Sequence, residues 1–142
     1  MTITVYGIPG PQGSKKYVGQ SKSGRGIMIE SSKKVKPWRD AVYLAARTEW
    51  LTIGKQEPIV SGPVFLSVVF SLPRPKAAKN GASADKRPDL SKLIRSTEDA
   101  LTQAGVWIDD ARVVECHARK VYIGDPLGLP EPGAVITIEA KR

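Results

Sequence analysis

The sequence predicts an α+β fold in a single domain covering residues 1–142, with a mixed or antiparallel sheet of about four strands packed by two helices. Segments rich in β-branched and aromatic residues alternate with two segments of helical periodicity, in the order strand, helix, strand, helix, strand, strand. The length suits one domain with a substantial core, and no internal repeat or heptad run suggests another architecture.

The strand segments are short and end at proline or glycine. We expect strands at 2–6, 63–72, 112–123 and 134–139, with a further brief strand at 27–29. A first helix is expected over 37–52, because Pro37 suits a first helical turn and apolar residues follow at helical spacing. Trp38 is assigned to core packing, and His117 to a strand rather than to general-base catalysis.

A second helix is expected over about 89–104 and carries an unusual concentration of charge. Asp89 occupies the N-cap position, apolar residues recur at helical spacing after it, and Gly105 ends the helix. Lys92, Arg95 and Asp99 project from the polar side, and an Asp109–Asp110 pair follows shortly after the helix. A capped surface helix with an acidic turn and a functional cluster both fit this pattern.

Composition narrows the chemistry. The chain has 22 Lys and Arg against 14 Asp and Glu, a formal net charge of +8, which favours a polyanionic partner such as nucleic acid. The single Cys and single His exclude a disulfide framework and the common zinc sites. An enzyme of this composition would use carboxylates, cations and a hard metal. Without a long apolar run or a signal-peptide pattern, we expect a cytoplasmic protein with no membrane association.

A basic loop is expected over about residues 9–34, which are rich in glycine, serine and lysine. A solvated linker and a phosphate-binding segment are both compatible with this composition, and the overall charge favours phosphate contact. The candidate DNA-binding residues in this loop are Lys15, Lys16, Lys22, Arg25, Lys33 and Lys34. Its Gly13-Ser14-Lys15 order does not match a Walker phosphate loop.

The stretch RPDLSKLIRSTEDALTQAGVWIDDARVVE, from Arg87 to Glu115, resembles the signature of the RusA-type Holliday junction resolvases. That signature is close to Asp-Leu-Asp-Asn-Leu followed by a lysine, then Asp-Ala-Leu, then Asp-Asp and a valine-rich strand. The resemblance implies a small homodimer of mixed α/β structure that binds four-way DNA junctions. It also implies paired nicks across the crossover with Mg²⁺, for which Mn²⁺ may substitute.

The resemblance assigns roles to individual residues. Asp89 and Asp110 match catalytic, metal-binding aspartates, and Asp109 matches the neighbour of the second one. Arg95 stands where the family has its catalytic lysine, and Ser91 stands where it has another metal-binding aspartate. The arginine keeps a positive charge for the scissile phosphate. The serine removes a carboxylate, so it would act on the metal only through water.

Three secondary candidates complete the site. Asp99 matches a later aspartate of the family helix, Lys92 adds a cation beside Asp89, and Arg87 joins the DNA-binding residues. Two alternatives stay open: a nuclease for flaps or other branched DNA, and a junction-binding protein whose cleavage was weakened or lost with Ser91. The expected location is the bacterial cytoplasm, either nucleoid-associated or encoded by a phage or prophage.

Overall fold

The computed structural model describes residues 1–13, 15–20, 26–30, 33–53 and 58–141, and of 15–20 and 26–30 the backbone alone. The strands are β1 (Thr2–Tyr6), β2 (Lys15–Gln20), β3 (Gly26–Glu30), β4 (Val64–Leu72), β5 (Val113–Tyr122) and β6 (Gly133–Ala140). The helices are α1 (Val35–Ile53) and α2 (Leu90–Gln103), and a 3-10 turn, Asp110–Arg112, precedes β5.

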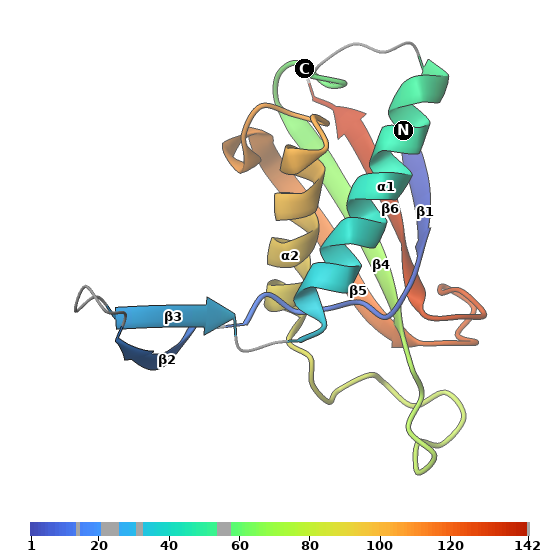
Figure 1. Cartoon of the computed structure of the whole chain (residues 1–142). Coiled ribbons are helices and arrows are strands. Elements are labelled where there is room, and N and C mark those ends of the chain that lie inside the picture. Colours follow the sequence, from blue (N-terminus) through green and yellow to red (C-terminus); the bar gives the residue numbers. More distant parts are fainter. Residues whose placement is uncertain (14, 21–25, 31–32, 54–57, 142) are drawn as a thin grey trace.

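Four of the strands form one mixed sheet in the order β1-β6-β4-β5. Strand β4 runs parallel to β5 and antiparallel to β6, and β1 pairs antiparallel with β6. Both helices lie on the same face of this sheet (Figure 1). Alternate residues of β4, Val64, Leu66, Val68 and Phe70, are buried and belong to the core. The predicted α+β fold with a four-stranded sheet and two helices is confirmed.

The two helices are joined by polar contacts inside the core. The Trp38 side chain of α1 is 1% exposed, as its assignment to packing predicted, and its Nε1 donates to the Thr97 hydroxyl of α2 at 3.1 Å. Ser96 and Thr97 of α2 are fully buried, whereas the apolar Leu90 and Ile94 of the same helix are only partly buried. Neither helix is long and apolar enough for a membrane span, within the residues that the structure describes.

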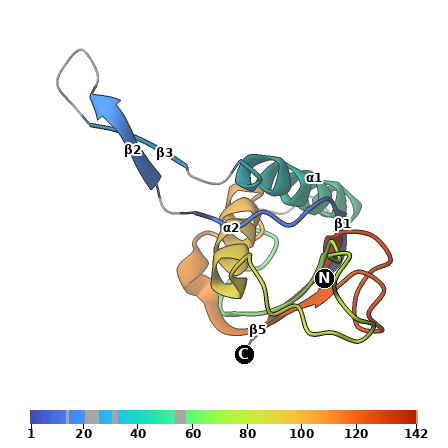
Figure 2. The ribbon, with the colours of Figure 1, turned by 90° about the horizontal axis from the view of Figure 1, so that it is seen from below.

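Strands β2 and β3 form an antiparallel hairpin where the sequence suggested a basic loop with one brief strand. The hairpin extends away from the four-stranded sheet (Figures 1 and 2). Pairing two strands satisfies backbone hydrogen-bonding groups that a loop would leave to water, which is the physical reason for the difference. The expected strand at 27–29 lies within β3.

Candidate functional site

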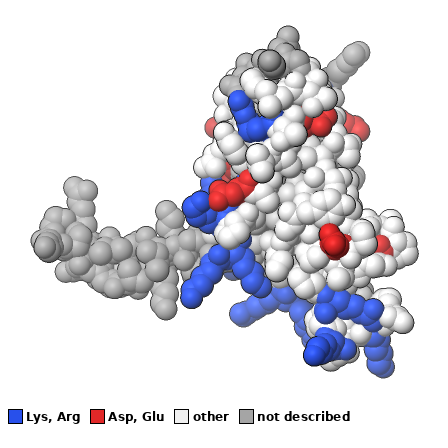
Figure 3. Space-filling model, turned by 45° about the vertical axis from the view of Figure 1, so that its right-hand side comes forward, with Lys and Arg blue, Asp and Glu red and all other residues white. Residues whose placement is uncertain are grey.

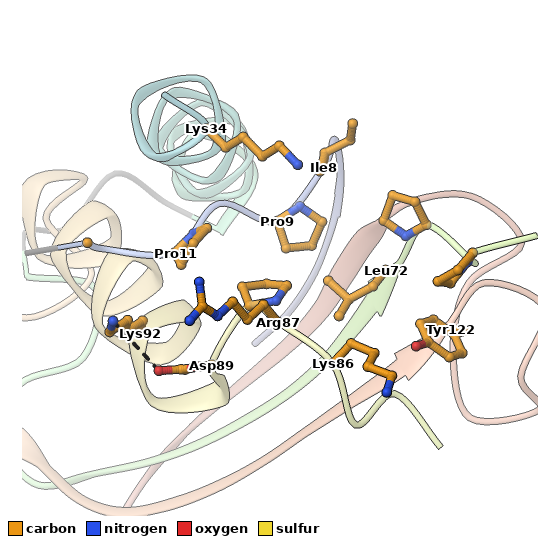
Figure 4. Close-up of a pocket in the computed structure, with 14 residues that line it drawn as sticks. Ile8, Pro9, Pro11, Lys34, Leu72, Lys86, Arg87, Asp89, Lys92 and Tyr122 are labelled. Carbon is orange, nitrogen blue, oxygen red and sulfur yellow. Dashed lines mark ion pairs between the residues drawn. The ribbon is translucent and has the colours of Figure 1, made fainter. Parts of the chain in front are cut away.

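A cleft of about 570 Å³ opens at the N-terminal end of α2. It lies between the segment after β1 and the segment that leads from β4 to α2 (Figure 4). The described residues that line it include four cations and one carboxylate: Lys34, Lys86, Arg87, Lys92 and Asp89. Because positive charge exceeds negative charge here, the cleft attracts an anionic group.

Specific contacts hold the two walls of the cleft in place. On one side, the Gln12 amide donates to the Lys92 carbonyl at 3.0 Å, and the Ser96 hydroxyl donates to the Gly10 carbonyl at 2.6 Å. On the other side, the Lys120 ammonium donates to the carbonyls of Lys86 and Pro88 at 2.5 and 2.9 Å. The cleft therefore has walls fixed by hydrogen bonds to α2 and β5.

Asp89 begins α2 without capping it. The residue is at the N-cap position with φ −68° and ψ 134°, as the sequence predicted, but its side chain makes no capping hydrogen bond within the described residues. Its carboxylate is 57% exposed and lies 3.6 Å from the Lys92 ammonium. Ser91 is exposed one residue into the helix. The Asp89 carboxylate is thus available to a ligand in the cleft.

Three carboxylates gather at the other end of α2. Burial raises the pKa of Glu98 to about 7, and the negative charges of Asp110 and Asp99 add to the shift. Burial and the Asp110 charge also raise the pKa of Asp99, while Arg39 and Arg95 oppose the increase. We call Glu98, Asp99 and Asp110 the acidic cluster. Carboxylates that raise one another's pKa values are stabilised by a bound cation.

Asp110 is fixed by a chain of hydrogen bonds from buried groups. The Thr102 hydroxyl donates to Asp110 Oδ1, and the indole Nε1 of Trp107 lies 2.7 Å from the Thr102 hydroxyl and 3.4 Å from Asp110 Oδ1. Asp109 has a different function, because its carboxylate accepts from the Ala111 amide at 2.7 Å and caps the 3-10 turn. The neighbouring aspartates therefore divide into a capping residue and a member of the acidic cluster.

Asp89 and Asp110 do not come together within one chain. Asp110 is bonded to Thr102, thirteen positions after Asp89, which corresponds to about 20 Å along the axis of α2. Within the described residues, no three His, Cys, Asp or Glu side chains are grouped to hold a metal ion. The assignment of Asp89 and Asp110 as metal ligands therefore stays a prediction, and within one chain the length of α2 separates the two carboxylates.

Glu98 was not among the site residues predicted from the sequence. Its position next to Asp99 was a signal, but its contact with Asp110 depends on how the chain folds back after α2. Arg95 is exposed on α2 between the two groups, and its charge acts on Asp99. The predicted site residues are therefore distributed along the helix instead of converging.

The predicted DNA-binding residues are found in different settings. Lys34 and Arg87 line the cleft, and Lys33 is exposed beside α1. Lys15 and Lys16 belong to β2, and Lys22 and Arg25 lie outside the described residues. Four exposed cations of the β4–α2 connection were not among the predicted DNA-binding residues: Arg74, Lys76, Lys79 and Lys86. Figure 3 shows lysine and arginine side chains gathered at this lower end of the molecule.

Comparison with known proteins decides the family. The family described as Endodeoxyribonuclease RusA matches residues 7–139. The chain belongs to this RusA family. The resemblance predicted from residues 87–115 is thereby confirmed over most of the chain, and the enzyme class is that of an endodeoxyribonuclease.

Several relatives are similar over most of their length. The protein YqaN of Bacillus subtilis (strain 168), described as uncharacterized, is 29% identical over 135 residues, 87% of this chain and 89% of YqaN. The crossover junction endodeoxyribonuclease RusA of Enterobacteria phage 82 is 27% identical over 116 residues, 82% of this chain and 81% of the relative. The enzyme of the same name from Escherichia coli (strain K12) is 26% identical with the same coverage.

Proposed function

We propose that this RusA-family chain is a magnesium-dependent, structure-selective endodeoxyribonuclease that resolves Holliday junctions by paired nicks in DNA recombination and repair. The observation that carries the proposal is α2 itself, with a basic cleft and an available carboxylate at one end and an acidic cluster at the other. Relatives named crossover junction endodeoxyribonucleases support the branched substrate, and their phage and bacterial sources support action in a bacterial cytoplasm.

The donor groups fit a hard divalent cation. Magnesium prefers carboxylate oxygen and water, and Asp89 and Asp110 are the proposed carboxylate ligands, with the Ser91 hydroxyl acting through water. When bound, magnesium supplies positive charge to the phosphate and lowers the pKa of water, and manganese has the same capacity. Arg95 stays protonated and stabilises the negative charge that develops on the phosphate oxygens.

A homodimer resolves the separation of Asp89 from Asp110. If a twofold axis crosses α2 near its middle, the Asp89 of one protomer lies beside the Asp110 of its partner, and two equivalent sites form. Exposed apolar residues support a contact near Asp110, because Ile108 and Val114 are 67% and 63% exposed. Two sites on a symmetric dimer also match the two opposed strands of a four-way junction.

A complementation experiment tests this assembly. Asp89→Asn and Asp110→Asn homodimers should each cleave a synthetic junction at least about a hundredfold more slowly, since each lacks a proposed ligand in both sites. Both should still bind the junction. Co-expression with two affinity tags yields the mixed dimer, in which one site has both aspartates and the other has neither.

The mixed dimer should recover nicking of one strand per junction, read on a denaturing gel with each strand labelled. A mixed dimer as inactive as its parents would show that both aspartates act within one protomer or that the metal assignment is wrong. The matched control is the mixed dimer of Asp89→Asn with wild type, which should lose one of the two nicks.

A junction-binding protein with weakened cleavage is the second candidate, and the Asp89–Lys92 pair favours it. At 3.6 Å, the Lys92 ammonium competes with a metal ion for the Asp89 carboxylate, and Ser91 adds no charge to offset it. Adding magnesium to a preformed junction complex separates the candidates, since only an enzyme yields nicked duplexes. A parallel series with flaps and linear duplex tests the broader branched-DNA nuclease, which would not require symmetric nicks.

A further inference from the structure

The cleft at the N-terminal end of α2 has an apolar wall as well as cations. Ile8, Leu72 and Tyr122 line it from three separate parts of the chain (Figure 4); Ile8 is 49% exposed, whereas Leu72 and Tyr122, at 4% and 8%, offer only small surfaces. Five prolines add to the lining: Pro9, Pro11, Pro73, Pro75 and Pro88. Proline fixes its backbone φ angle, so a wall rich in proline loses little conformational freedom when a ligand binds. A phosphate alone would need no such wall.

The cations that line the cleft suit a phosphodiester. Within the described residues, Lys86 and Arg87 form no ion pair, and Lys92 has the exposed Asp89 as its partner. Among the described residues, the charges of Lys86 and Arg87 are therefore not neutralised by carboxylates. The volume of about 570 Å³ falls within the 300 to 1,000 Å³ that is usual for small-molecule sites. This is the scale of a single nucleotide and too small for a stack of base pairs.

We propose that the cleft takes one unpaired nucleotide of the DNA strand at the branch point. Its base lies against Ile8, Leu72 and Tyr122, and its phosphate faces Lys86, Arg87 and Lys92. The inference rests on the proposed function, because a junction supplies the substrate. Extracting a base from duplex costs a few kcal/mol and costs least where pairing is already disturbed, as it is where four strands meet. The cleft thereby selects branched over linear DNA.

The position of Asp89 connects this nucleotide to the reaction. The carboxylate lines the same cleft, so a strand that enters it passes a proposed metal ligand. Capture of the nucleotide would fix the neighbouring phosphodiester near Asp89 and exclude strands that remain fully paired. The cleft therefore gives a physical basis for structure selectivity that the charge of the chain alone does not supply.

The test pairs protein variants with abasic DNA. Junction affinity is measured without magnesium on an intact junction and on junctions with one abasic nucleotide at each branch position. Ile8 is 49% exposed, so Ile8→Ser alters the apolar wall without opening the core. For wild type, an abasic nucleotide at one of the branch positions should lower junction affinity by about fivefold or more, which is the affinity that stacking of one base on an apolar or aromatic surface usually provides. Ile8→Ser should bind the intact junction more weakly than wild type by a similar factor. On the junction with that abasic nucleotide, Ile8→Ser and wild type should bind almost equally.

Two lysines of the same connection provide matched charge controls. Lys86→Ala removes a cation that lines the cleft, and Lys76→Ala removes an exposed cation of the same segment that does not line it. Lys86→Ala should weaken binding to intact and abasic junctions alike, and more than Lys76→Ala does. In addition, 2-aminopurine at the sensitive position should brighten on binding wild type and respond less to Ile8→Ser. Urea unfolding verifies that each variant is folded.

The inference fails if, at every branch position, the loss of affinity from Ile8→Ser is the same on abasic and intact junctions. The two changes would then act independently, and no base would enter the cleft. The same conclusion follows if 2-aminopurine fluorescence is unchanged at all of them. Cleavage by wild type would then still support the proposed nuclease. Absence of both junction binding and magnesium-dependent cleavage would instead overturn the proposed function, so the two failures are distinguishable.

Discussion

Asp89 occupies the N-cap position of α2, yet its carboxylate lies against Lys92 at 3.6 Å instead of making a capping hydrogen bond. An uncapped helix start loses stabilisation of about 0.5–2 kcal/mol that an aspartate at this position usually provides. Asp109 shows the contrast, because it does cap its turn, at 2.7 Å from the Ala111 amide. The hydrogen bonds around each residue thus distinguish the two aspartates: Asp109 has a structural role, and Asp89 is available to a ligand.

Ser91 allows a test of metal affinity at this position. Ser91→Asp places a second carboxylate beside Asp89, and a magnesium site with few carboxylates gains from each added charge. We expect the magnesium concentration for half-maximal cleavage to fall by about threefold or more. Ser91→Asn is the matched control, since it changes shape without charge. A Ser91→Asp variant that needs more metal would show that the added carboxylate pairs with a neighbouring cation.

Glu98 predicts a pH dependence of stability. Its pKa is raised from 4.5 to about 7, so between these values the folded state binds more protons than the unfolded state. Stability must therefore fall as pH rises through this window and then level off. Glu98→Gln should flatten the fall and unfold at higher urea than wild type at pH 8, but not at pH 4. Glu139→Gln, at an exposed position on β6, should leave the wild-type fall intact.

At the scale of the element, α2 is organised by its neighbours. The segment after β1 is attached to it through Gln12 and Ser96, and α1 is attached through Trp38 and Thr97. The β2–β3 hairpin leaves the body between these two attachments, as Figure 2 shows. The base of the hairpin therefore lies beside the basic cleft.

Gly10 allows the chain before the β2–β3 hairpin to lie close to the chain after it, at Lys34. A Cβ at this position would overlap with the backbone carbonyl of Lys34, which cannot move like the end of a flexible side chain. Gly10→Ala should lower the free energy of unfolding by about 1–3 kcal/mol, as overpacking usually does. Urea unfolding measures this, and junction affinity should also fall because Lys34 lines the cleft. An unchanged urea midpoint would mean that this approach contributes little to stability.

The hairpin lysines predict a salt dependence. Replacing Lys15 and Lys16 together by alanine should reduce the slope of log affinity against log salt by about 1 to 2 units if both contact phosphate. The control removes two lysines that are paired with acids in the fold, Lys36 with Asp40 and Lys141 with Glu115, both near 2.8 Å. That double variant should change the slope less. Equal slopes for all three proteins would exclude β2 from the contact surface.

At the scale of the whole molecule, α2 has a basic surface at one end and an acidic cluster at the other. Two chains related by a twofold axis through α2 would place these opposite ends together, which is favourable for both. In this proposed dimer each site takes Asp89 from one protomer and Asp110 from the other, so a single chain would not form a complete site. Ile108 and Val114, both strongly exposed, are next to the acidic end.

Val114→Arg tests this interface. A charge in place of an exposed apolar contact should raise the dimer dissociation constant by at least about tenfold and reduce cleavage in proportion to the lost dimer. Analytical ultracentrifugation measures the association state. Leu127→Arg, at a residue that is 56% exposed in the β5–β6 connection, should leave both dimer and cleavage unchanged. Full dimerisation of Val114→Arg would locate the interface elsewhere.

The sequence by itself determined the family and most of the elements, although not the β2–β3 hairpin. The periodicities of 2 and 3.6 arise from local backbone geometry, so β4, β5 and α2 could be predicted within a few residues. The motif from Arg87 to Glu115 is contiguous, so its resemblance to RusA enzymes needed no fold. Charge likewise follows from composition. Periodicity and the motif depend only on residues that are close together along the chain.

Only the tertiary structure decided which residues meet. The cleft combines Ile8, Lys34, Leu72, Arg87 and Tyr122, which come from five separate parts of the sequence. The turn after α2 returns Asp110 to the helix beside Thr102, at the end opposite to Asp89. Spacing along a chain does not specify the direction of such a turn, because long-range hydrogen bonds from α1 and from the segment before β4 hold it. The separation of Asp89 from Asp110 therefore has a cause that no local pattern contains.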